Sequence, residues 1–238
     1  MKGVILAGGK GTRLLPLTKI TNKHLLPIHD RPMIFYPLET LRQSGISEIL
    51  IVTDGKFIAQ FKKILNSSLQ KKLKIKVLFA IQKKADGIAG ALKLAEKFAA
   101  GEKIAVILGD NIFEANFRED AKIFRIGAKV FLKKVPDPER FGVAEIRGSQ
   151  IVRIQEKPRR AKSDLAVVGL YFFDKRVFDI IRKIQPSKRG ELEITAVNNF
   201  YLQTKSLNFT KIKGFWKDAG TFASLAEATK FIRENSKK

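Results

Sequence analysis

The sequence predicts a doubly wound α/β fold, in which a mixed but largely parallel sheet is followed by a smaller antiparallel extension. In the first half, short segments that are apolar almost throughout alternate with helical patterns. After about residue 120, strand-like segments follow one another with fewer helices between them. Near-continuous apolar strands are typical of a parallel sheet covered on both faces, and their alternation with helices predicts βαβ units.

The first half contains four expected strands and three expected helices. The strands are Gly3–Ala7, Glu48–Thr53, Ile75–Ile81 and Lys103–Leu108, and the helices are Pro32–Ser44, Lys56–Leu65 and Gly87–Ala100. Pro32 suits the first turn of a helix, because proline lacks the N–H that a helix start leaves unpaired. Gly45 suits the end of the same helix.

The second half completes the sheet and returns to helices at its end. Strands are expected at Lys129–Val135, Gly142–Ile146, Ile151–Gln155 and Leu165–Phe173, and helices at Lys175–Ile184, Glu191–Gln203 and Thr221–Glu234. The chain has no repeat, low-complexity tract or long linker, so we expect residues 1–238 to form a single domain.

Composition excludes several classes of function. The 238 residues include no cysteine, which excludes a cysteine nucleophile, thiolate zinc sites and iron–sulfur clusters, and favours a reducing, cytoplasmic location. No apolar run approaches the roughly 18–20 residues of a membrane span, and the N-terminus does not resemble a signal peptide. We therefore expect no membrane partner.

The net charge of +23 is the unusual feature of the composition. Such a charge suits nucleic acid, anionic lipid or phosphorylated small molecules, and it is also what a lysine-rich proteome produces. The basic clusters Lys71–Lys76 and Arg159–Lys162 lack the interleaved aromatic residues of a nucleic-acid surface. We therefore expect no nucleic-acid partner.

A glycine-rich turn, Gly8-Gly9-Lys10-Gly11, follows the first expected strand. Glycines let backbone N–H groups approach an anion closely. The turn is neither a Walker A loop, because Gly9 stands at the lysine position, nor a dinucleotide fingerprint, because Leu14 stands at the third glycine. It predicts a triphosphate cradle, and the alternative is a tight strand–helix turn with solvated cations.

Nine stretches of the chain carry a resemblance to a known family. They are Gly8–Thr18, Asn22–Pro27, Gln82 with Asp86-Gly87, Leu108–Asn111, Phe141–Val143, Glu156–Pro158, Val168–Tyr171, Arg189–Thr195 and Trp216–Thr221. In this order and spacing the chain resembles the sugar-1-phosphate nucleotidyltransferases, and among them the glucose-1-phosphate thymidylyltransferases. The resemblance implies their Rossmann-like fold, with nucleotide-binding residues at about 1–120 and sugar-phosphate-binding residues at about 121–238.

The reaction that the resemblance implies is Mg²⁺-dependent transfer of a nucleotidyl group from dTTP to glucose 1-phosphate, giving dTDP-glucose and pyrophosphate. The attacking phosphate is already an anion at pH 7, so no general base is required. Alternatives are a UTP-dependent uridylyltransferase or another sugar-1-phosphate nucleotidyltransferase. Two readings from other classes are a catalytically degenerate regulatory homologue and a basic nucleic-acid-binding protein.

The resemblance also implies roles for individual residues. Arg13 would contact the leaving β- and γ-phosphates, Lys23 the α-phosphate, and Lys157 with Arg189 the sugar phosphate. The nucleotide would further contact Leu6, Gly8, Gly9, Gly11, Thr12, His24, Gln82, Gly87 and Asp110. The sugar phosphate would further contact Asn111, Gly142, Glu156, Val168 and Tyr171. Asp110 and Asp218 would bind Mg²⁺, which prefers hard oxygen ligands.

The chain departs from the family pattern at several places, among them His24 and the C-terminus. His24 stands where thymidylyltransferases usually carry Gln, near the nucleotide sugar, which leaves the choice between ribose and deoxyribose open. The sequence also stops soon after Glu234. We therefore expect a short form without the C-terminal extension of longer members, and no feedback inhibition through that segment. A homo-oligomer is compatible with the sequence.

Overall fold

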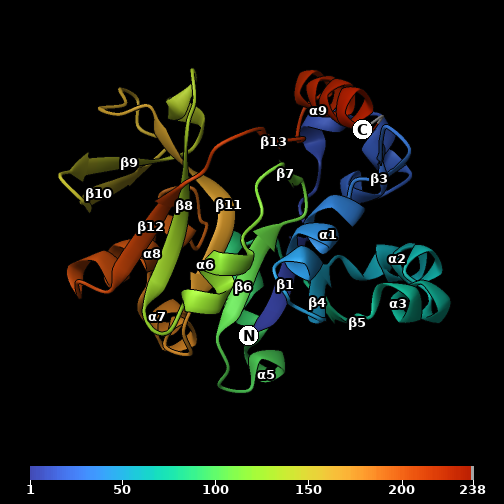
Figure 1. The fold of residues 1–238 in the computed structure, drawn as a ribbon, viewed down its shortest axis with the longest axis horizontal. Coiled ribbons are helices and arrows are strands. Elements are labelled where there is room, and N and C mark those ends of the chain that lie inside the picture. The colour runs from blue at the N-terminus through green and yellow to red at the C-terminus, as the bar shows by residue number, and fades with distance from the viewer. Residues whose placement is uncertain (237–238) are drawn as a thin grey trace.

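The computed structural model describes residues 1–236 as one central mixed sheet with helices on both faces (Figure 1). Seven strands follow the order β10-β9-β11-β6-β1-β4-β5, β8 pairs with β11, and β12 pairs with β8. The parallel part consists of β1 (Lys2–Ala7), β4 (Glu48–Thr53), β5 (Lys76–Ile81) and β6 (Ile104–Leu108). The α/β fold class is confirmed.

The inner parallel strands β1, β4 and β6 are apolar almost throughout because both of their faces are buried, whereas the edge strand β5 is partly exposed. Val4 and Leu6 point into one hydrophobic cluster, whereas Ile5 and Ala7 point into the cluster on the opposite face of the sheet. Successive side chains of a strand alternate between faces, so a strand covered on both sides has no position for a polar residue.

Helices supply the two covering layers. The α-helices are α1 (Phe35–Gln43), α2 (Ile58–Ile64), α3 (Ser67–Leu73), α4 (Ile88–Lys93), α5 (Glu96–Ala99), α6 (Arg118–Ile123), α7 (Val177–Lys183), α8 (Ile194–Gln203) and α9 (Phe222–Asn235). Helices α1 and α2 pack with the Ile5 side of the sheet, and α4, α7 and α8 with the Val4 side. No helix among residues 1–236 combines the length and apolar character that crossing a bilayer requires.

The second half of the chain extends the same sheet. Strand β11 (Leu165–Phe173) pairs antiparallel with β6, and β8 (Ala128–Lys134) pairs antiparallel with β11. Strands β9 (Gly142–Arg147) and β10 (Gln150–Glu156) form an antiparallel hairpin that joins β11, as expected. Strand β12 (Leu207–Lys211), which the pattern does not reveal, adds a parallel edge to β8.

Two small sheets and five 3₁₀ turns complete the described chain. Strand β2 (Pro27–Ile28) pairs with β3 (Arg31–Pro32), and β7 (Asn111–Phe113) pairs with β13 (Trp216–Asp218). The 3₁₀ turns are Thr12–Leu14, Leu17–Lys19, Lys23–Leu25, Gly55–Phe57 and Pro138–Arg140. Helix α9 packs on both small sheets through a cluster that includes Ile28, Ile112 and Ala219, and so holds β13 in place.

Two of the expected helices are wrong in detail. Pro32 does not begin a helix, because it lies in β3, and the N–H of the following Met33 donates to the Leu26 carbonyl to close the hairpin. Helix α1 starts at Phe35, and Pro37 occupies its first turn instead. The single helix expected over 87–100 is two helices, α4 and α5, because the chain turns at Leu94 and Ala95.

Truncation of an aromatic side chain in the core beside α6 should destabilise the protein. Phe131 is fully buried and packs edge-on against Phe117 and Phe172, with ring centroids 4.8 and 5.1 Å away. We expect Phe131→Ala to lower the free energy of unfolding by about 3–5 kcal/mol, because a cavity remains. Urea denaturation measures this, and Ile126→Ala, at a side chain that is 69% exposed, should change it by less than about 0.5 kcal/mol.

Candidate active site

Two adjoining pockets lie at the carboxyl ends of the parallel strands. The glycine-rich turn follows β1, Gln82 follows β5, and Asp110 lies two residues after β6, so all three loops meet at one sheet edge. Open α/β sheets bind their ligands at this edge. The first pocket has a volume of about 490 Å³ and the second about 640 Å³.

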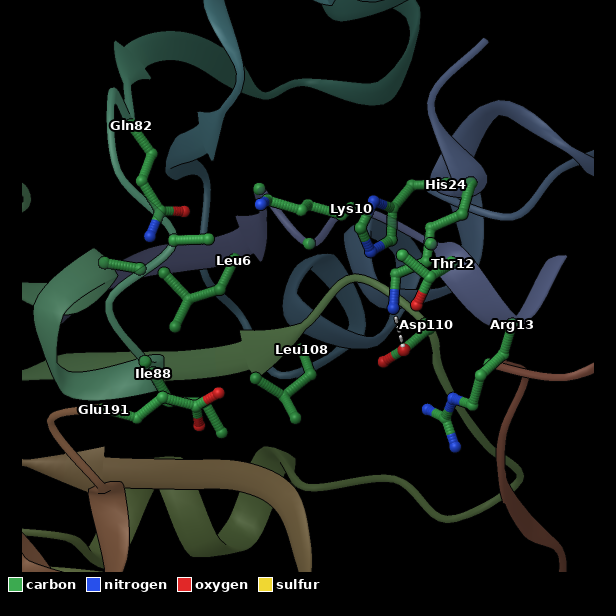
Figure 2. Close-up of a pocket in the computed structure, with 18 residues that line it drawn as sticks. Leu6, Lys10, Thr12, Arg13, His24, Gln82, Ile88, Leu108, Asp110 and Glu191 are labelled. Carbon is green, nitrogen blue, oxygen red and sulfur yellow. Dashed lines mark hydrogen bonds and ion pairs between the residues drawn. The ribbon is translucent and has the colours of Figure 1, made fainter. Parts of the chain in front are cut away.

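The first pocket gathers every residue that was predicted to bind the nucleotide (Figure 2). Its lining includes Leu6, Gly8, Gly9, Gly11, Thr12, Arg13, Lys23, His24, Gln82, Gly87 and Asp110. The second pocket gathers Asn111, Gly142, Glu156, Lys157, Tyr171 and Asp218. Arg13, Ile88, Leu108 and Asp110 line both, so the pockets meet beside Asp110.

The glycine-rich turn has its shape because side chains would not fit. A Cβ at Gly8 would lie 2.0 Å from the Gln82 side-chain oxygen, so Gly8 lets the turn approach the loop after β5. Gly11 adopts a left-handed conformation with φ of 65°, and its carbonyl accepts the N–H of Leu14 to start the 3₁₀ turn Thr12–Leu14. The turn therefore presents its backbone along the first pocket.

An ion pair joins the two loops at the centre of the site. The Lys23 ammonium lies 2.5 Å from a carboxylate oxygen of Asp110, drawn as a dashed line in Figure 2, and both side chains are largely buried. Burial alone would raise the pKa of Asp110, but the neighbouring positive charge and hydrogen bonds, led by the Lys23 ammonium, together outweigh burial and hold that pKa below its usual range. Asp110 is therefore an anion at neutral pH.

Asn22 fixes the orientation and proton position of His24. The Asn22 amide nitrogen donates to the Ala7 carbonyl at 3.1 Å, so its oxygen must be the acceptor on the other side. That oxygen receives the backbone N–H of His24 at 3.0 Å and lies 2.6 Å from ring nitrogen Nδ1. Nδ1 therefore carries the ring proton, and Nε2 is an acceptor. Burial, and next the Lys23 ammonium, lower the pKa of His24 to about 3.

Asp110 and Asp218 form a pair of carboxylates in the second pocket. Asp218 lies on β13 opposite Asn111 of β7, and the Ala219 N–H donates to the Asp110 carbonyl at 2.8 Å. Burial, and then the negative charge of Asp110, raise the pKa of Asp218. A carboxylate whose ionisation is opposed by a neighbouring carboxylate fits a site for a divalent cation.

The protein offers this cation few ligands. Among residues 1–236 no group of three or more Asp, Glu, His or Cys side chains surrounds one point. Mg²⁺ is commonly held by one or two carboxylates, with water and substrate phosphates completing its shell. The donor set therefore fits Mg²⁺ bound together with a phosphorylated substrate.

The second pocket also holds polar groups for a hydroxylated ligand. The Thr195 hydroxyl donates to a Glu156 carboxylate oxygen at 2.5 Å, and both line the pocket beside Gly142. Lys157 has a positive φ of 40°, which is a strained backbone conformation for lysine. The Lys157 side chain is exposed, and the backbone N–H of Lys157 donates to the Phe141 carbonyl at 2.9 Å.

Two predicted residues do not line either pocket. Val168 is fully buried in the hydrophobic cluster on the other face of the sheet, and its neighbours Val167 and Gly169 line the second pocket instead. Arg189 lies at the rim, where its guanidinium bonds to Glu193 at 2.8 Å and lies 3.5 Å from Glu191. In this conformation Arg189 is neutralised by carboxylates.

Sequence reasoning missed several lining residues. Arg140 lines the second pocket, pairs with Asp137 at 2.6 Å and lies 3.7 Å from Asp218. Trp216 donates its indole N–H to Asn111 at 2.8 Å. Arg140 directly precedes the Phe141–Val143 stretch, so its position beside that motif was the available signal.

Comparison with known proteins identifies the family. Residues 2–235 match the family model described as "Nucleotidyl transferase". The chain belongs to the nucleotidyl transferase family. The family that the motifs predicted is thus confirmed, and with it the prediction that the chain is a nucleotidyltransferase.

Relatives of this nucleotidyltransferase share most of its length. The glucose-1-phosphate thymidylyltransferase of Neisseria meningitidis serogroup A is 44% identical over 98% of this chain and 83% of that protein. The protein of the same name from Actinoplanes sp. is 41% identical over 98% of this chain and 78% of that protein.

Solved structures share the fold. A crystal structure described as a glucose-1-phosphate thymidylyltransferase from Bacillus anthracis in complex with sucrose is 45% identical, with a TM-score of 0.92, over 98% of this chain and 96% of that chain. A UDP-glucose pyrophosphorylase complexed with UDP-glucose is 26% identical, with a TM-score of 0.87, over 98% of both chains.

The buried, neutral His24 should make stability depend on pH. The pKa of His24 lies below that of an unfolded histidine, so acid protonates the unfolded chain first and favours unfolding. On acidification from pH 6.5 toward the folded pKa of about 3, the free energy of unfolding should fall by up to about 1.4 kcal/mol per pH unit from this group. Urea denaturation at pH 7 and pH 5 measures the slope. His24→Gln should remove this contribution, and an equal slope in both proteins would contradict the burial argument.

Proposed function

We propose that this nucleotidyltransferase transfers a nucleotidyl group from dTTP to glucose 1-phosphate, with Mg²⁺, giving dTDP-glucose and pyrophosphate. The observation that carries the proposal is the pair of pockets that meet beside Asp110. A two-substrate reaction needs both substrates side by side, and the relatives named glucose-1-phosphate thymidylyltransferase support this choice of substrates.

The proposed step forms one phosphorus–oxygen bond and breaks another. A phosphate oxygen of glucose 1-phosphate in the second pocket attacks the α-phosphorus of dTTP in the first pocket. The bond from the α-phosphorus to the bridging oxygen breaks, and pyrophosphate leaves with that electron pair. Because the attacking oxygen is already ionised, no side chain has to remove a proton. The protein's task is to align two polyanions and to stabilise charge.

In this proposal, cationic side chains perform this task. In the proposal Lys23 meets the α-phosphate, Arg13 the leaving phosphates, and Lys157 the sugar phosphate, with Arg189 moving from its carboxylates to join it. Asp110 and Asp218 would hold Mg²⁺, which would neutralise charge on the transferred group. Arginine suits bidentate phosphate contacts, and lysine acts as a point charge.

The base and the sugar would be read by polar groups of the two pockets. The Gln82 side chain offers both a donor and an acceptor, which matches the imide edge of thymine or uracil. Glu156 and the backbone near Gly142 would meet sugar hydroxyls. In this proposal the chain works as one domain, with the nucleotide portion at about 1–120 and the sugar-phosphate portion at about 121–238.

UTP is the second candidate nucleotide. Thymine and uracil present the same imide edge to Gln82, and a UDP-glucose pyrophosphorylase has a closely similar fold. A pyrophosphate-release panel that crosses dTTP, UTP, CTP, ATP and GTP with several sugar 1-phosphates separates the candidates. We expect dTTP with glucose 1-phosphate to react fastest and UTP to follow. Rates led by a purine triphosphate would refute the proposed role of Gln82.

Removing one charge from the carboxylate pair should abolish turnover without unfolding the protein. Asp110→Asn keeps the shape of the side chain but removes its negative charge. Lys23 then has no carboxylate partner, and Mg²⁺ would have only the carboxylate of Asp218 to bind. We expect a loss of activity of at least about 10³-fold, measured by pyrophosphate release, with an unchanged circular dichroism spectrum. The matched variant Asp164→Asn, at an exposed pair with Lys134, should retain wild-type activity. Full activity of Asp110→Asn at ordinary Mg²⁺ would remove Asp110 from the metal site.

A further inference from the structure

The cations of the two pockets differ in whether a carboxylate already neutralises them. Lys23 pairs with Asp110, Arg140 with Asp137, and Arg189 with Glu193. Among residues 1–236, Lys10 and Arg13 make no ion pair with any carboxylate, although both line the first pocket. The positive charge that the first pocket offers to a new anion therefore comes from Lys10 and Arg13.

A triphosphate requires more than one such cation. Lys23 cannot supply its full charge, because Asp110 lies 2.5 Å from its ammonium. Arg13 lies at the junction of the pockets, with a guanidinium nitrogen 2.9 Å from the position that a Cβ on Gly220 would take. Lys10 belongs to the first pocket alone and is exposed, so it can turn toward a ligand without breaking a contact.

The backbone places Lys10 next to the reacting end of the nucleotide. A Cβ at the adjacent Gly9 would lie 3.6 Å from the Lys23 ammonium nitrogen, so the turn passes directly over that group. A lysine carries its charge on a long, flexible stem, so the Lys10 ammonium can reach neighbouring positions along the pocket. In Figure 2 the Lys10 side chain lies between the labelled Gln82 and His24.

We propose that Lys10 is a further substrate-binding residue of the reaction, whose ammonium contacts the phosphates that leave as pyrophosphate. This inference rests on the proposed function and adds to it a second free cation beside Arg13. Because Asp110 already neutralises Lys23 in part, the leaving phosphates depend on groups that carry unshared charge. Lysine suits this task as a mobile point charge that follows the phosphates as they depart.

The test is Lys10→Gln, with Lys63→Gln as the matched control. Both variants lower the net charge by one, but Lys63 is exposed on α2 and lines neither pocket. We expect Lys10→Gln to raise the KM for dTTP, and the KM for pyrophosphate in the reverse reaction, about tenfold. The KM values for glucose 1-phosphate and dTDP-glucose should stay within twofold of the wild-type values. Lys10→Arg should bring the KM for dTTP and for pyrophosphate most of the way back to the wild-type values.

Two further measurements separate the outcomes. Charge contacts weaken with ionic strength, so the ratio between wild type and Lys10→Gln should shrink from 50 to 500 mM KCl. Calorimetric titration with magnesium pyrophosphate should show about tenfold weaker binding to Lys10→Gln whether or not dTTP is the substrate. If the wild type releases no pyrophosphate from any substrate pair, the proposed function fails, and this titration still reports on Lys10. Equal behaviour of Lys10→Gln and Lys63→Gln, or an equal rise in the KM for glucose 1-phosphate, would overturn the inference.

Discussion

The contact between the Lys23 ammonium and the Asp110 carboxylate joins the two loops that form the centre of the site. Lys23 belongs to the segment that follows β1, and Asp110 to the segment that follows β6, the neighbouring parallel strand. The carboxyl ends of parallel neighbours lie at the same sheet edge, so both groups must meet there. Asp110 lines both pockets. Next to Lys23, Asn22 donates to the Ala7 carbonyl and accepts the backbone N–H of His24, and so fixes the segment that carries Lys23.

The sequence predicted the parallel strands within one residue at each end, because their side chains are apolar almost throughout, as expected for β1, β4 and β6, which are buried on both faces. Periodicity failed where tertiary contacts decide the structure. Helix α3 presents mostly polar residues, and β12 is a half-exposed edge strand, so neither has a hydrophobic pattern that marks it. Pro32 has the chemistry of a helix start, but a hairpin with Pro27 takes it into β3 instead.

The members of the candidate site could be predicted because the motif stretches lie in loops that one sheet edge brings together. What the sequence could not reveal is the direction and the partner of each side chain. Val168 lies in a motif, but alternation along β11 turns it to the opposite face. Arg189 also lies in a motif, but three nearby carboxylates neutralise it. Arg140 reaches Asp218 through the fold alone, since 78 positions in the chain separate residues 140 and 218.

The net charge of +23 cannot by itself explain how the site would attract phosphates. At physiological ionic strength, charges more than about 8 Å apart in water are largely screened, so most surface lysines contribute little inside a pocket. Groups within the pocket are screened less, and their effect depends on whether a carboxylate already neutralises them. Lys23 lies against Asp110, whereas the exposed Lys10 makes no ion pair among residues 1–236. Local pairing, more than total charge, therefore decides which cations of this nucleotidyltransferase are available to a substrate.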